Sequence, residues 1–80
     1  MPKIPLVSGK EAVKALQRLG FVFIRQRGSH AILRRETPDG ARGCVVPMHT
    51  EIQPGTMRGI LKQAGIDVEN FIEHLWLSKP

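Results

Sequence analysis

The 80-residue sequence contains one cysteine, no tyrosine and no long run of hydrophobic residues. Because Cys44 has no second cysteine to pair with, an intramolecular disulfide is excluded, and we expect a reducing, cytoplasmic setting. No apolar stretch approaches the roughly 18 residues that a membrane-spanning helix needs, and the first residues lack the hydrophobic segment of a signal peptide. We therefore expect a protein that is neither secreted nor inserted in a membrane.

Metal-ligand motifs and phosphate-binding loops are also missing from the sequence. Cys44, His30 and His49 could ligate a metal, but no C-x-x-C motif, H-E-x-x-H motif or carboxylate pair surrounds them. The glycines fall at expected turns and helix ends rather than in a phosphate loop. Without tyrosine, an aromatic platform for stacked bases is poorly supported. We therefore expect no metal and no cofactor.

What the sequence has in excess is positive charge. Its 12 Lys+Arg against 7 Asp+Glu give a formal net charge of +5 and a pI near 10.2. Such a surplus suggests a polyanionic partner, RNA or DNA before a membrane surface, and a basic domain without such a partner is the alternative. Residues 18–62 hold eight basic residues against three acidic ones, whereas residues 65–80 carry more acid than base. The uneven distribution predicts a binding face within residues 18–62.

The first half of the chain predicts a helix followed by an antiparallel meander. Ser8 and Glu11 are spaced as a capping box, so a helix is expected over about residues 9–19, ending at Gly20. Residues rich in β-branched and aromatic side chains then predict three strands, over residues 21–26, 30–35 and 42–48. The first strand is apolar on both faces, and only one can meet the helices. The other is expected to be exposed or covered by a partner.

The second half predicts two further helices. The body of the first contains Met57 and ends at Gly65, and its start is left open between Thr50 and Pro54. Asp67 is placed to cap a short third helix. Together these elements predict one α+β domain over residues 1–80, in the order α-β-β-β-α-α, with helices packed on one face of a three-stranded antiparallel sheet.

Three histidines are candidates for chemistry. His30 follows a Gly-Ser turn between arginines, where an imidazole can exchange a proton at neutral pH while the arginines bind phosphate. A surface histidine in a strand is the alternative. His49, after the third strand, is either a second acid/base or phosphate contact, or a turn histidine. His74 is expected to be an ordinary surface residue. The arginines around His30 are Arg25, Arg27 and Arg34.

Several blocks of the sequence resemble the HicA (YcfA-like) mRNA interferase toxins. Residues 24–30 (IRQRGSH) look like the signature hairpin of that family, and residues 46–49 (VPMH) and 55–66 look like its second half. The opening SGKE and the following LGF are also similar. These shared motifs cover about residues 8–66, in order, and leave residues 67–80 as a C-terminal helix and tail.

The resemblance implies a fold like that of the double-stranded RNA-binding domain. It also implies that the protein is the toxin of a type II toxin–antitoxin system. It implies a metal-independent endoribonuclease that cleaves mRNA and inhibits translation, with a HicB-like antitoxin as its partner. His30 matches the catalytic histidine, and His49 is a possible secondary acid/base. A non-catalytic RNA-binding module and a small protein-interaction adaptor are the alternatives. The expected RNA-binding residues are Arg25, Arg27, Gly28, Ser29, Arg34, Thr56, Arg58 and Lys62.

Overall fold

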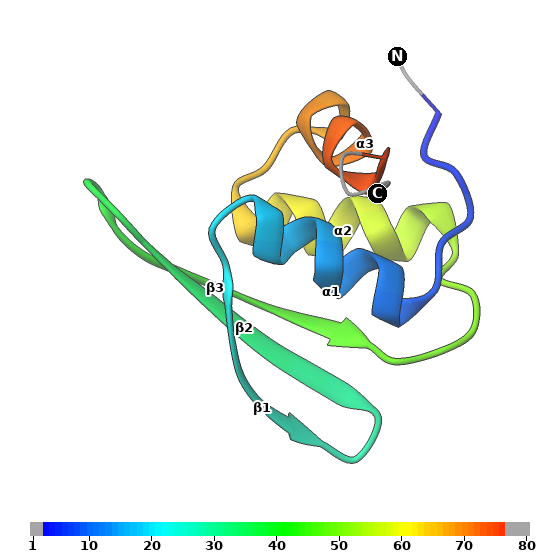
Figure 1. Ribbon diagram of the computed structural model, residues 1–80, viewed down its shortest axis with the longest axis horizontal. Helices are drawn as coiled ribbons and strands as arrows, with labels where there is room; N and C mark the ends of the chain where they lie inside the picture. The colour runs from blue at the N-terminus through cyan, green and yellow to red at the C-terminus, as the bar shows by residue number, and fades with distance from the viewer. Residues whose placement is uncertain (1–2, 77–80) are drawn as a thin grey trace.

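A computed structural model describes residues 3–76, and Figure 1 shows a sheet with three helices on one side of it. The elements are α1 (Gly9–Arg18), β1 (Val22–Arg27), β2 (His30–Thr37), β3 (Gly40–Pro47), α2 (Pro54–Ala64) and α3 (Val68–Trp76). The predicted α+β order is therefore confirmed. The tail expected after the third helix lies outside the described residues. Among the described helices, none is long and apolar enough to cross a membrane.

The sheet is an antiparallel meander in the order β1-β2-β3, so β2 is the central strand. His30 at the start of β2 pairs with Arg27 on one side and with Pro47 on the other. The register of β1 shifts between Phe23 and Arg25, which leaves a bulge there. The far end of the β2–β3 hairpin extends past the helices (Figure 1).

Side chains alternate between the two faces of the sheet, and the core lies on the helix side. Ala31 and Leu33 of β2 and Val46 of β3 are fully buried, and Cys44 is 2% exposed. They pack against the apolar stripes of the helices, including Leu16, Met57, Leu61 and Phe71. The intervening residues of the strands point to the opposite face, which no described element covers.

Local signals set the helix boundaries. Both hydrogen bonds of the predicted capping box are present at Ser8 and Glu11. Of the two starts left open for α2, the structure has Pro54, with Gln53 as an N-cap that makes no side-chain bond. Gly65 ends α2 with a φ of +72°, in the left-handed region that glycine tolerates. The Asp67 carboxylate accepts a hydrogen bond from the Asn70 amide at 2.7 Å and so caps α3.

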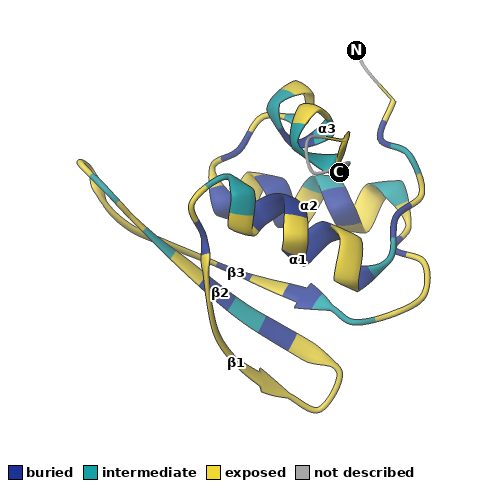
Figure 2. Cartoon of the chain, in the orientation of Figure 1, coloured by how far each residue is buried: buried dark blue, intermediate teal, exposed yellow. Residues whose placement is uncertain are grey.

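The expectation that one face of the first strand meets the helices is wrong. All six residues of β1 are exposed, as Figure 2 shows, and the buried aromatic is Phe21, just before the strand. The reason is the placement of the helices: α2 packs mainly on β3, at the opposite edge, and α1 packs mainly against α3. The helices therefore cover β2 and β3 and leave β1 beyond the core.

Candidate nucleic-acid interface

The face of the sheet turned away from the helices, called the open face below, brings together the residues that surround His30. Because Ala31 and Leu33 point into the core, their neighbours His30 and Arg34 point outward. Residues paired across strands share a face, so Arg27, the partner of His30, and Arg25, the partner of Ile32, also point outward. His30 and three of its flanking arginines thus occupy one exposed surface.

The Gly28-Ser29 turn holds His30 in place. Gly28 has a φ of +58°, which a two-residue hairpin loop requires and which a glycine adopts without strain. The Gln26 side chain donates a hydrogen bond to the Gly28 carbonyl at 3.0 Å, and the Met48 amide donates to the Ser29 carbonyl at 2.6 Å. The turn is therefore anchored from both neighbouring strands, while the His30 imidazole stays exposed to a substrate.

The arginines of the open face differ in whether an acidic side chain already pairs with them. Arg34 forms an ion pair with Glu36 at 3.0 Å, between side chains that are 57% and 75% exposed. A pair this exposed contributes at most about 1 kcal/mol, and it partly neutralises Arg34. Within residues 3–76 no ion pair involves Arg25 or Arg27. These two arginines are the strongest candidates for phosphate contacts beside His30.

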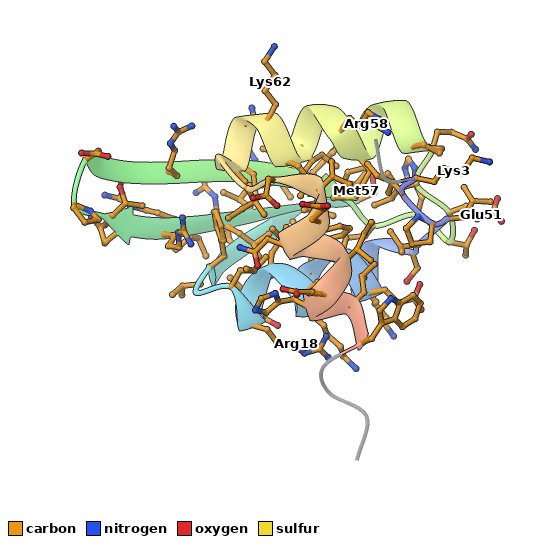
Figure 3. The ribbon with its side chains drawn as sticks, turned by 90° about the horizontal axis from the view of Figure 1, so that it is seen from above. Lys3, Arg18, Glu51, Met57, Arg58 and Lys62 are labelled. Atoms are coloured by element: carbon orange, nitrogen blue, oxygen red, sulfur yellow. The ribbon has the colours of Figure 1, made fainter. Side chains whose placement is uncertain are left out.

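Three other candidates lie in a different layer. Thr56, Arg58 and Lys62 belong to α2, on the helix side of the sheet. Thr56 and Lys62 are exposed and Arg58 is half-buried, and Figure 3 shows the Lys62 side chain extending from α2 into the surrounding space. The structure therefore gathers Arg25, Arg27, Gly28, Ser29, His30 and Arg34 and keeps Thr56, Arg58 and Lys62 apart from them. A ligand that contacts both sets has to pass around the edge of the domain.

Three basic residues counted in the binding face instead stabilise helix ends. Arg35 donates to the Leu19 carbonyl at the end of α1, at 3.0 Å, and Arg18 donates to the His74 carbonyl near the end of α3, at 2.6 Å. The Arg42 guanidinium lies beside Gly65, where an added Cβ would be 3.0 Å from its Cζ. Cations at helix C-termini satisfy free carbonyls and complement the macrodipole. The prediction of one binding face from the whole excess of residues 18–62 is wrong for these arginines.

Arg35 also packs against an aromatic ring. Its guanidinium lies 5.2 Å from the centre of the Phe21 ring, a cation–π distance, and its Nε is buried with no hydrogen-bond partner. The expectation that His74 is an ordinary surface residue is also wrong: it is half-buried, and its Nδ1 lies 2.7 Å from the Asn70 carbonyl oxygen. Arg35 joins β2 to the end of α1 through a contact 16 positions away in sequence, whereas the side-chain contact of His74 lies within α3.

His49 lies at the same end of the sheet as His30. Pro47, two residues before it, pairs with His30, and the His49 carbonyl accepts a hydrogen bond from the Gly9 amide at 2.9 Å. A Cβ on Gly9 would lie 2.5 Å from the Pro47 carbonyl oxygen, so only glycine allows α1 to approach this closely. A hollow of about 400 Å³ opens here. It is lined by Ser8, Lys10, Gln26, Met48, His49 and Thr50, and His30 does not line it.

Cys44 takes no part in this surface. It is buried on the helix side, as expected for a small apolar side chain. Burial raises the pKa of its thiol to about 11, so the thiol is protonated at neutral pH and is a poor nucleophile. Within residues 3–76 no three His, Cys, Asp or Glu side chains are grouped so that they could hold a metal ion.

Comparison with known proteins places this geometry in a family. A family model described as the HicA toxin of bacterial toxin–antitoxin systems matches residues 9–66. The matched span runs from the start of α1 past the end of α2 and includes every candidate site residue, from Arg25 to Lys62. α3 lies beyond it. A search of curated proteins finds no match to the chain.

Proposed function

The chain belongs to the HicA toxin family of bacterial toxin–antitoxin systems, and we propose that it is a metal-independent endoribonuclease that cleaves mRNA and inhibits translation. Membership of the family implies an antitoxin partner, which we propose to be HicB-like. One observation carries the enzymatic proposal: the turn holds an exposed imidazole at His30 directly across from Arg27, on the open face of the sheet.

The proposed reaction needs one base, one acid and positive charge at the phosphate. Neutral His30 accepts the proton of a ribose 2′-hydroxyl, and the 2′-oxygen attacks the adjacent phosphorus. Arg25 and Arg27 stabilise the negative charge that grows on the phosphoryl oxygens. The bond from phosphorus to the 5′-oxygen breaks, and a general acid protonates that oxygen. The products are a 2′,3′-cyclic phosphate and a 5′-hydroxyl.

The remaining candidates have supporting roles in this proposal. Gly28 and Ser29 position His30 through their backbone, and Arg34 adds charge farther along β2. His49 is the first candidate for the general acid, because it lies at the same end of the sheet as His30. An arginine or a water molecule is the alternative. Thr56, Arg58 and Lys62 contact the phosphate backbone of a strand that continues around the domain onto α2.

The test is cleavage of RNA by the purified protein in EDTA, with the chemical ends of the products mapped. We expect cyclic phosphate and 5′-hydroxyl ends from the unmodified protein, and a loss of roughly 10²–10⁴-fold in rate for His30→Ala, the usual size of a general-base contribution. His74→Gln is the matched control, since it removes a histidine on α3 and leaves the open face intact. A fully active His30→Ala protein, or cleavage of a substrate with a 2′-deoxy group at the scissile position, would refute the proposal.

The same experiment separates the alternative functions. A non-catalytic RNA-binding module retains RNA affinity, with a steep dependence on salt, but yields no product. A protein-interaction adaptor shows little affinity for RNA. The exposed apolar residues of β1 favour a protein contact in addition to catalysis.

A further inference from the structure

β1 is an edge strand with exposed apolar side chains in succession. Val22, Phe23 and Ile24 are 60%, 40% and 52% exposed, although most large apolar side chains in the described residues are buried. The strand order leaves the outer edge of β1 without a partner strand within residues 3–76. An unpaired edge presents backbone N–H and C=O groups that can pair with a strand from another chain.

The surface beside this strand is also hollowed. A depression of about 220 Å³ is lined by Val22 and Ile24 together with Arg34 and Glu36 of β2. Apolar residues from an incoming chain can fill such a depression and bury the two aliphatic side chains. The edge and the depression are adjacent, because Val22 belongs to the first and pairs with Arg34 in the second.

The chemistry of the strand selects its occupant. Val22 and Ile24, which line the depression, are aliphatic and offer no ring on which an RNA base could stack. Phe23, the aromatic residue of β1, pairs with Leu33 and so belongs to the other face of the sheet. The depression therefore suits a protein. A second copy of this chain carries the same net charge of +5, and its own β1 holds no carboxylate, so it would leave Arg25 and Arg27 without complementary charge. A partner strand with apolar residues and carboxylates complements both halves of β1.

We propose that β1 is the docking strand for the antitoxin, which pairs a β-strand with its outer edge, packs apolar side chains on Val22 and Ile24, and places acidic side chains near Arg25 and Arg27. The inference rests on the proposed function, because it takes the antitoxin as the partner. Arg27 pairs with His30, so a strand seated along β1 also occupies the phosphate-binding arginines.

The test is the affinity of the 80-residue protein for a purified HicB-like antitoxin, compared between the unmodified protein and the double variant V22T/I24T. Threonine retains a β-branched shape and strand propensity but removes apolar surface. We expect the dissociation constant to rise roughly 10- to 100-fold, as for truncation of central interface contacts. Val45→Thr is the matched control, since Val45 is 40% exposed on β3, the opposite edge strand. This variant should bind the antitoxin as the unmodified protein does. RNA cleavage by V22T/I24T should match that of the unmodified protein.

A measurement without mutation accompanies this comparison. Hydrogen exchange of the unmodified protein should show new protection of β1 amides when the antitoxin is added, and it covers the case in which V22T/I24T does not fold. Unchanged antitoxin affinity in V22T/I24T, or unprotected β1 amides in the complex, would overturn the inference. The inference would also be overturned if V22T/I24T lost affinity for RNA, or lost self-association, while its affinity for the antitoxin stayed the same. If the unmodified protein cleaves no RNA, the proposed function fails, and the affinity comparison still decides the inference.

Discussion

The division of the arginines between the open face and the helix ends predicts that two variants of equal net charge behave differently. R25Q/R27Q removes two charges from the open face. R35Q/R42Q also removes two, but from residues that lie against the ends of α1 and α2. Arg35 and Arg42 are cross-strand partners on the same hairpin, so each double variant changes one compact region. The overall charge of the protein is the same in both.

The expected magnitudes follow from the contacts. Each phosphate contact on a single strand contributes about 0.7 to the slope of log affinity against log salt, so R25Q/R27Q should lower that slope by about 1.4. R35Q/R42Q should leave it nearly unchanged. That variant should instead lose about 2–4 kcal/mol of stability, from a charged hydrogen bond, a cation–π contact and a cation at a helix end. R25Q/R27Q, at exposed positions, should stay within about 0.5 kcal/mol of the unmodified protein.

The assay is RNA binding titrated at several salt concentrations, paired with urea unfolding of each variant. The His30→Ala background prevents cleavage during the titration. An equal fall of slope in both double variants would refute the division, because it would mean that RNA responds to total charge rather than to the open face. Unchanged stability in R35Q/R42Q would refute the role assigned to the two arginines at the helix ends.

Two further predictions concern the core. Phe71 on α3 is completely buried although it lies beyond the family match, so Phe71→Ala should lower the free energy of unfolding by about 3–5 kcal/mol in urea. The control is Trp76→Ala, because Trp76 is 56% exposed. If Phe71→Ala lowers the free energy of unfolding by less than about 1 kcal/mol, α3 contributes little to the core. Burial raises the pKa of the Cys44 thiol from 9.0 to about 11. As pH rises, the thiol of the unfolded chain therefore ionises before the thiol of the folded protein does. The contribution of Cys44 to stability is fully present below pH 9.0 and is lost as the pH rises to about 11. Relative to Cys44→Ala, the unfolding free energy should fall by about 1.4 kcal/mol per pH unit in that window, and identical pH profiles for the two proteins would contradict this.

The elements of the fold could be predicted because their signals are local. The capping box at Ser8 and Glu11, the turn at Gly28 and the left-handed stop at Gly65 each depend on residues a few positions apart. Side chains of β2 alternate between the two faces of the sheet. Once the helices bury one face, this alternation places Ala31 and Leu33 on the core side and His30 on the other. The HicA family itself was visible in the blocks around His30 and α2, and the family match confirms it.

The tertiary structure decided which of those residues share a surface. Charge counted along the chain could not distinguish Arg25, which lies on the open face, from Arg35, whose hydrogen bond joins residues 16 positions apart. Nor could the apolar pattern of β1 show that the helices stop short of it, because that depends on how α1 and α2 pack. Periodicity reports which side chains can face a core. Where the core ends is set by the area that the helices cover, and in this protein that limit leaves β1 exposed beside His30.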